Sequence, residues 1–237
     1  MPQDLKGQVA VVTGATRGIG RAIAEALLHQ GAQVALCARQ ASAVQKTIRE
    51  LESLGRVAGQ ACNVGRFDEV RDFFRFVDKT FGRLDVLVNN AGIGHFGAVD
   101  ELTPDQWREV LDTNLSGVFY CCHEGVPLMK KSGGGFIVNI GSLAGKNPFL
   151  GGSAYNASKF GLNGFTEAIM MDLRHDKIRV TQIMPGSVQT EFAGSDPSGD
   201  WKIAPEHIAE TVVCLLRMPE RSLASRVEMR PSRPPKK

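Results

Sequence analysis

The stretch TGATRGIG, residues 13–20, follows directly on the apolar run QVAVV, residues 8–12. A short apolar run rich in β-branched residues is typical of a buried strand. After Gly18 the apolar positions recur at helical spacing as far as Gln30, and Gly31 supplies a helix stop. The stretch therefore predicts a sharp turn from a first strand into a first helix.

The same order of strand and helix repeats along the chain. Further apolar runs predict strands at residues 32–39, 57–64, 84–92, 134–142, 178–186 and 225–231. Amphipathic stretches predict helices at residues 42–55, 68–82, 103–131, 154–176 and 204–218. This alternation predicts a parallel sheet with helices on both faces. The expected fold class is α/β, a three-layer doubly wound Rossmann fold with a mostly parallel seven-stranded sheet.

No internal repeat or shift in composition divides the chain, so residues 1–237 are predicted to form a single domain. The longest stretch without periodicity, residues 187–202, is rich in Gly, Ser, Asp and Pro and is interpreted as a substrate lid. The basic, proline-rich end at residues 230–237 is expected to be a flexible terminus, with contact to a neighbouring subunit as the alternative.

Charge and cysteine content exclude several classes of function. The 28 basic and 25 acidic residues are scattered and leave a net charge of +3, too little for a nucleic-acid surface. The five cysteines include no pair with metal-ligand spacing, so no metal is expected and they are interpreted as reduced thiols in a cytoplasmic protein. We find no signal-peptide pattern and no apolar run near ~20 residues, so we expect no membrane insertion.

Three glycines mark the first turn. Gly14, Gly18 and Gly20 follow a G-x-x-x-G-x-G pattern where the strand passes into the helix. Such a turn lets the backbone approach a pyrophosphate, which then lies at the positive N-terminus of the helix. The alternative is a turn that needs glycine only for its backbone conformation. The spacing differs from the more common G-x-G-x-x-G, so the glycines alone leave both interpretations open.

The end of the second predicted strand bears on the choice of dinucleotide. NAD sites usually place an acidic residue there to bind the ribose 2′-hydroxyl, but this chain has Ala38 followed by Arg39. Arg17 lies within the glycine turn itself. Guanidinium groups match the charge and geometry of a 2′-phosphate, so we predict NADP(H) over NAD, with two solvated surface arginines as the alternative.

Several ordered motifs together resemble one family. The stretch TGATRGIG, the NNAG at residues 89–92, and Ser142 placed thirteen residues before the YNASK that begins at Tyr155 resemble the short-chain dehydrogenase/reductase family. The similarity is to NADP-dependent members such as 3-oxoacyl reductases and extends from Gly7 to about Glu191. Many such relatives end in a longer segment with two glycines, whereas this chain ends in LASRVEMRPSRPPKK.

The resemblance implies a catalytic tetrad of Asn114, Ser142, Tyr155 and Lys159. Tyr155 and Lys159 lie four residues apart in a predicted helix and so share one face. A nearby cation is expected to lower the pKa of the phenol from ~10 towards a range suited to acid–base catalysis. By resemblance Tyr155 protonates the substrate carbonyl, Ser142 binds the same oxygen, and Lys159 binds the nicotinamide ribose. Asn114 would hold a water linked to Lys159.

The resemblance also implies a set of cofactor-binding residues, which lie at the ends of the predicted strands. They are Gly14, Thr16, Arg17, Gly18, Ile19, Gly20, Arg39, Asn63, Val64, Asn90, Ala91, Gly92, Tyr155, Lys159, Pro185, Gly186, Val188 and Thr190. Asn63 stands where the family usually has an aspartate against the adenine, and its side-chain oxygen can accept the same hydrogen bond.

The expected activity is reduction of a ketone or aldehyde of medium size, a 3-oxoacyl thioester among the candidates. Predicted substrate contacts are Ser142, Leu143, Asn156 and Phe192, and further pocket candidates are His95, Phe96, Ala144, Phe149 and Trp201. A catalytically silent NADP(H)-binding sensor or scaffold is the main alternative, and an RNA-binding role is a second. The partners expected are a small carbonyl substrate and a second copy of the chain, since the helices at residues 105–131 and 154–173 carry apolar residues on more than one face. A dimer and a tetramer both remain open.

Overall fold

A computed structural model describes residues 5–194, 196 and 198–235. Its strands form one sheet in the order β3-β2-β1-β4-β5-β6-β7, and all six pairings between neighbours are parallel. The strands are β1 (Val9–Thr13), β2 (Gln33–Ala38), β3 (Val57–Ala61), β4 (Val86–Asn89), β5 (Gly135–Ile140), β6 (Ile178–Pro185) and β7 (Arg226–Met229). The predicted doubly wound parallel sheet is confirmed.

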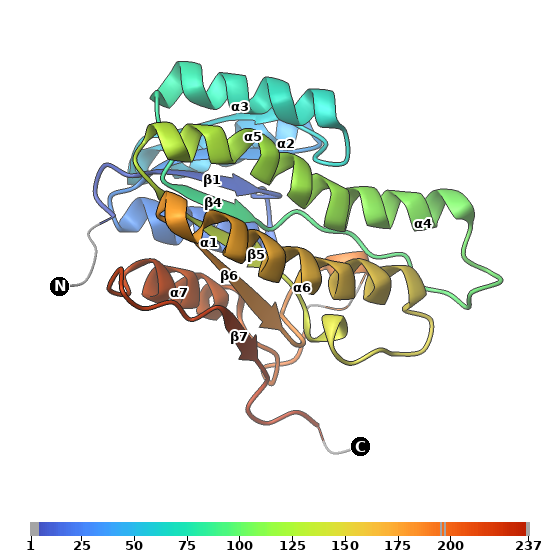
Figure 1. Ribbon diagram of the computed structural model, residues 1–237. Coiled ribbons are helices and arrows are strands. Elements are labelled where there is room, and N and C mark those ends of the chain that lie inside the picture. Colours follow the sequence, from blue (N-terminus) through green and yellow to red (C-terminus); the bar gives the residue numbers. More distant parts are fainter. Residues whose placement is uncertain (1–4, 195, 197, 236–237) are drawn as a thin grey trace.

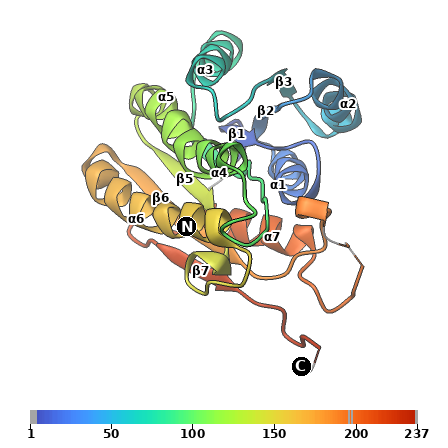
Figure 2. The same cartoon turned by 90° about the vertical axis from the view of Figure 1, so that its right-hand side faces the viewer.

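Helices cover both faces of this sheet (Figures 1 and 2). One layer consists of α1 (Gly18–His29), α2 (Ala41–Leu51) and α7 (Pro205–Leu216), and the other of α3 (Phe67–Phe81), α4 (Pro104–Leu111), α5 (Gly117–Lys131) and α6 (Ser153–Leu173). In β1, Ala10 and Val12 pack with the first layer, whereas Val11 packs with the second. Since successive side chains of a strand point to opposite faces, a strand that is apolar throughout needs both layers.

The helix predicted for residues 103–131 is interrupted. A capping box at Thr103 begins α4, but Asp112–Ser116 form a π-helical segment before α5 starts at Gly117. The residues of this segment include no glycine or proline, so their pattern predicted one continuous helix. A π-helical turn admits an extra residue and is frequently found at functional sites. In this chain it contains Asn114.

The segments that follow the strands all emerge at one edge of the sheet, because every strand runs in the same direction. The strands end earlier than predicted, so the motif residues Asn63, Gly92 and Ser142 lie just beyond them. Of the predicted lid, Val188 forms a bridge with Ile203, and Phe192–Gly194 form a short 3₁₀ turn. Residues 195 and 197 of that lid, and residues 236–237 of the predicted tail, lie outside the described residues.

Within the described part of the chain, no helix is both long enough and apolar enough to cross a lipid bilayer.

Candidate active site

The glycine turn after β1 needs glycine for two different reasons. Gly14 and Gly18 have φ angles of 64° and 54°, in the left-handed region that side chains disfavour. Gly20 has an ordinary φ, but a Cβ atom there would lie 2.4 Å from both Asn90 Nδ2 and the Gly14 carbonyl oxygen. The turn is therefore packed directly against the end of β4.

Asn90 and Thr13 join the glycine turn to β4. Asn90 Nδ2 donates to the carbonyl oxygens of Thr13 and Gly14 at 2.9 and 3.1 Å. The backbone N–H groups of Asn90 and Ala91 both donate to Thr13 Oγ1 at 3.0 Å. Sequence reasoning missed Thr13, whose position directly before the first glycine was the available signal.

The N-terminus of α1 suits an anion. Arg17 is the N-cap residue, its side chain makes no capping hydrogen bond, and the first turn of the helix carries no acidic residue. The positive end of the helix dipole and the first backbone N–H groups therefore face the glycine turn, and no acidic side chain in the first turn of α1 neutralises them. With the close backbone approach that the glycines allow, these features fit a dinucleotide pyrophosphate.

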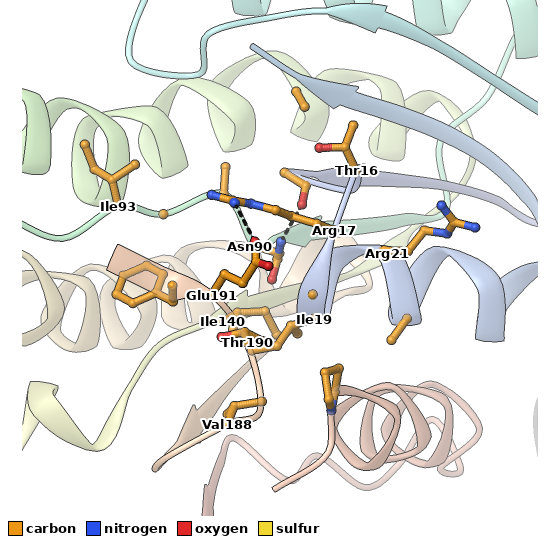
Figure 3. A pocket seen from close by; sticks show the side chains of 18 of the residues that line it. Thr16, Arg17, Ile19, Arg21, Asn90, Ile93, Ile140, Val188, Thr190 and Glu191 are labelled. Carbon is orange, nitrogen blue, oxygen red and sulfur yellow. Dashed lines mark hydrogen bonds and ion pairs between the residues drawn. The ribbon is translucent and has the colours of Figure 1, made fainter. Parts of the chain in front are cut away.

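A cleft of about 1160 Å³ runs along this edge of the sheet. Every predicted cofactor-binding residue except Gly20 lines it. Thr16 and Ile19 approach it from the glycine turn and α1, and Val188 and Thr190 from the segment after β6 (Figure 3). Segments distant in sequence thus form one continuous binding surface, large enough for a dinucleotide.

Tyr155 and Lys159 of α6 lie at this cleft beside Ser142. Lys159 is only 4% exposed; its Nζ donates to the Ile140 carbonyl oxygen at 3.0 Å and lies 5.7 Å from the centre of the Tyr155 ring. A side-chain hydrogen bond links Ser142 to Tyr155, and Ser142 Oγ also accepts from the Ala144 N–H at 3.1 Å. These three predicted tetrad residues are therefore brought together.

Asn114, the fourth predicted tetrad residue, is completely buried. Its Oδ1 accepts from the Ile93 N–H at 2.8 Å, and its Nδ2 donates to the Ile93 carbonyl oxygen at 2.9 Å and to Ser158 Oγ at 3.1 Å. Ser158 Oγ in turn donates to the Tyr155 carbonyl oxygen at 2.7 Å. The amide thus ties the segment after β4 to the helix that carries Tyr155, a positioning role that sequence reasoning did not include. The water-holding role of Asn114 stays a prediction.

Burial shifts the pKa values of both residues on α6. It lowers the pKa of Lys159 to about 8, because the ammonium loses its hydration. It raises the pKa of Tyr155 above its usual value, and the hydrogen bond with Ser142 opposes this only in part. The predicted lowering of the Tyr155 pKa by Lys159 is therefore wrong in this structure, where the ammonium is directed to Ile140. At neutral pH Tyr155 holds its proton, the form that a general acid requires.

The two predicted phosphate-binding arginines each have an acidic partner. Arg17 lies 3.5 Å from Glu191 of the lid, and the two side chains point toward each other in Figure 3. Arg39 Nη1 lies 3.1 Å from Glu109 of α4, whose other carboxylate oxygen is 2.8 Å from His95 Nε2. The pKa of Glu109 is lowered mainly by its hydrogen bond with His95 and, to a smaller extent, by the attraction of Arg39. Nothing in the sequence spacing indicated either glutamate.

Two predicted contact residues have internal partners. Asn63 Oδ1, expected to face the adenine, accepts from the Gly65 N–H at 3.1 Å. Asn156 is buried and its Nδ2 donates to the Ala144 carbonyl oxygen at 2.6 Å, which supports the loop before α6. Neither Asn156 nor Leu143 lines the cleft, in contrast to Ser142 and Phe192.

Comparisons with known proteins agree with this geometry. The family model described as short chain dehydrogenase matches residues 8–200. A putative ketoacyl reductase of Streptomyces coelicolor is 38% identical over 86% of this chain and 81% of its own length. A cyclohexanol dehydrogenase of Acinetobacter sp. strain SE19 is 34% identical over 91% of this chain and 90% of its own.

A solved structure extends the agreement to three dimensions. The crystal structure of a metagenomic short-chain oxidoreductase in complex with NADP matches with a TM-score of 0.86 at 39% identity, covering 97% of this chain and all of the other. The match to the family model spans most of the chain, including the glycine turn and the Tyr155–Lys159 pair. This chain belongs to the short-chain dehydrogenase/reductase family and is an NAD(P)-dependent oxidoreductase.

Proposed function

We propose that this protein uses NADPH to reduce a ketone or aldehyde to an alcohol, with Tyr155 as the general acid. The observation that carries the proposal is a half-buried tyrosine that is protonated at neutral pH, hydrogen-bonded to Ser142 and close to a buried lysine, beside a cleft suited to a dinucleotide.

The roles follow from the chemistry of carbonyl reduction. When bound, NADPH supplies the hydride that is added to the carbonyl carbon. Tyr155 donates its phenolic proton to the carbonyl oxygen, which completes the alcohol. Ser142 stabilises the negative charge that develops on the same oxygen by hydrogen bonding. Lys159 binds the cofactor ribose, and Asn114 keeps the backbone of Ile93 in place beside the site.

The proposal is tested by measuring NADPH consumption with a panel of carbonyl compounds, for the native protein and for Tyr155→Phe. Turnover that depends on Tyr155 supports the reductase. Tight NADPH binding without turnover of any carbonyl compound would instead support the silent sensor.

We propose NADP(H) as the cofactor because Arg17 and Arg39 both line the cleft. The NADP bound to the metagenomic relative supports this choice. A 2′-phosphate would compete with Glu191 and Glu109 for these exposed arginines, and its two negative charges favour it over a carboxylate.

Replacing Arg39 with aspartate should therefore weaken NADPH binding by about 10- to 100-fold, the effect of losing a charge-assisted hydrogen bond. NADH binding should change much less, because NADH has no 2′-phosphate. Dissociation constants for both cofactors provide the measurement. Arg75→Asp makes the same charge change on α3, away from the cleft, and serves as the control. Equal losses for the two cofactors would contradict the assignment.

We propose that the substrate is a carbonyl compound of medium size, either a neutral ketone or an acyl compound. The two relatives' names refer to a ketoacyl and a cyclohexanol substrate, so both a 3-oxoacyl thioester and a cyclic ketone are candidates.

A cytoplasmic location stays a prediction.

We also propose that the chain forms a homo-oligomer through α5 and α6. Phe119, Phe160 and Met171 on these helices are 48%, 45% and 63% exposed, and apolar side chains of this size can pack against a partner. Light scattering should give a mass that is a multiple of the 25.7 kDa chain mass. A Phe119→Glu variant should shift the equilibrium towards the monomer, and a native protein that is monomeric at micromolar concentration would contradict the proposal.

A further inference from the structure

Three phenylalanine rings surround the Tyr155 ring. The centres of Phe192, Phe96 and Phe149 lie 5.5, 5.8 and 6.4 Å from the centre of the Tyr155 ring. Phe96 and Phe149 also contact each other edge to face, with their centres 5.6 Å apart. The rings come from the loop after β4, the loop before α6 and the lid, so only the tertiary structure assembles this aromatic box of Phe96, Phe149, Phe192 and Tyr155.

The backbone beneath the box is shaped for these rings. A Cβ atom at Gly94 would lie 2.7 Å from Phe96 Cζ and 3.3 Å from Phe192 Cε1. A Cβ atom at Gly152 would lie 2.7 Å from Phe149 Cζ. Side chains at either glycine would displace the rings, so the close packing of phenyl groups next to Tyr155 depends on both positions.

The box opens to the surface through apolar groups. Phe96 and Phe149 are 49% and 46% exposed, and Leu150, next to Phe149, is fully exposed. The two loops are held together by a hydrogen bond from the Gly97 N–H to the Gly151 carbonyl oxygen at 3.0 Å. An exposed apolar patch that adjoins a reactive side chain is typical of a site that binds an apolar ligand.

The charges near the box are engaged elsewhere. Lys159 approaches the Tyr155 ring but donates to the Ile140 carbonyl oxygen. Lys146, in the same loop as Phe149, is paired with Glu228 at 2.8 Å. Of the arginines that line the cleft, Arg17 and Arg39 are assigned above to the cofactor, and Arg21 is paired with Glu50. The aromatic box therefore offers aromatic faces to a substrate, rather than a cation that would bind the negatively charged carrier of an acyl thioester.

We infer that the substrate is a neutral ketone whose carbonyl group belongs to a ring or is directly attached to one, and that the ring binds against the exposed faces of Phe96 and Phe149 in the aromatic box. This inference rests on the proposed reductase function and decides between its two substrate classes. A rigid ring can cover several aromatic faces while losing little conformational freedom, whereas a flexible acyl chain must be ordered to do so. Hydride addition to the ring ketone and protonation of its oxygen by Tyr155 yield a secondary alcohol.

The test compares substrates of equal carbon number. Initial rates of NADPH oxidation are measured with cyclohexyl methyl ketone, with 2-octanone, and with the N-acetylcysteamine thioester of acetoacetate. We expect kcat/KM to be highest for the ring ketone, by about 10-fold over the open-chain ketone, the effect of roughly one to two aromatic contacts. Because both ketones are methyl ketones on saturated carbon, their intrinsic reactivities are similar.

Variants of the box connect that preference to its rings. Phe96→Leu and Phe149→Leu keep an apolar side chain but remove the aromatic face. Each should raise KM for the ring ketone by about 3- to 10-fold and raise KM for 2-octanone less, because an alkyl chain keeps its apolar contact with leucine. Phe67→Leu is the control, because Phe67 is also a partly exposed ring but contacts Tyr120 and His123 instead.

The outcomes separate the two proposals. If no carbonyl compound is reduced in a Tyr155-dependent way, the proposed function itself fails. If turnover depends on Tyr155 but the thioester or 2-octanone is preferred, the reductase stands and the ring substrate is wrong. A ring preference that survives in both Phe variants would also overturn the role of the aromatic box.

Discussion

Replacing Tyr155 with phenylalanine is expected to lower kcat for carbonyl reduction by about 10²- to 10⁴-fold, the usual contribution of a positioned general acid. The substitution removes a single oxygen and keeps the ring, so contacts with Phe96 and Phe192 persist. The oxygen carries the proton that the alcohol product requires, and no other side chain in the tetrad is both protonated at neutral pH and bonded to Ser142.

The binding of NADPH should be nearly unchanged in this variant, because the glycine turn and the arginines are untouched. Fluorescence titration with NADPH and steady-state rates with a reactive ketone provide the two measurements. Tyr120→Phe is the matched control: it alters the only other tyrosine of the chain, which lies in α5 against Phe67 and Phe119. Similar rates for both variants would contradict the assignment of Tyr155 as the acid.

Replacing Lys159 with methionine is expected to stabilise the protein at neutral pH while it removes activity. Burial lowers the pKa of Lys159 from its ordinary 10.5 to about 8, which corresponds to a penalty of roughly 3 kcal/mol for the buried charge. Methionine has a similar volume and no charge. The variant lacks the hydrogen bond from Lys159 Nζ to the Ile140 carbonyl oxygen, and this loss costs about 1 to 2 kcal/mol. The net gain should be about 1 to 2 kcal/mol, or roughly 2 to 8 °C in Tm.

The gain should disappear as the pH rises. Below pH 8 both the folded and the unfolded native chain hold the Lys159 proton, so the full penalty is present. Between about 8 and 10.5 only the unfolded chain holds it, and raising the pH therefore favours the folded state of the native protein. Near the upper end of this window the native protein should be at least as stable as the variant, since a neutral lysine still donates to Ile140.

Thermal melts of both proteins without added cofactor, at pH 7 and pH 10, measure this change of order. Lys79→Met is the control for general effects of alkaline pH, because Lys79 is exposed on α3. A Lys159→Met variant that is less stable than the native protein at pH 7 would contradict the estimate of the burial penalty. A reductase rate that persists in the variant would contradict the role of Lys159 in the tetrad.

Most of the successful predictions rested on residues that are close together in the sequence. The glycine turn was recognisable because a strand, three glycines and a helix are adjacent in the chain. Tyr155 and Lys159 could be placed on one face because helical spacing alone requires it. The parallel sheet followed from the alternation of strands and helices, since parallel neighbours need a crossover between them.

Long-range contacts account for what was missed. The π-helical segment at Asp112–Ser116 accompanies the hydrogen bonds between Asn114 and Ile93, which are 21 residues apart. The partners of Arg39 and Arg17, Glu109 and Glu191, come from other elements of the fold. No local pattern reports such pairings.

By itself the sequence determined the doubly wound sheet, the position of the glycine turn and the placement of Tyr155 and Lys159 on one helix face, because each follows from local patterns and spacing. The tertiary structure alone decided how those groups behave. It directed the Lys159 ammonium to Ile140 and raised the Tyr155 pKa, because desolvation depends on everything packed around a group. It also gathered Phe96, Phe149 and Phe192 around Tyr155, because loops that are remote in the chain meet only at the carboxyl edge of the folded sheet.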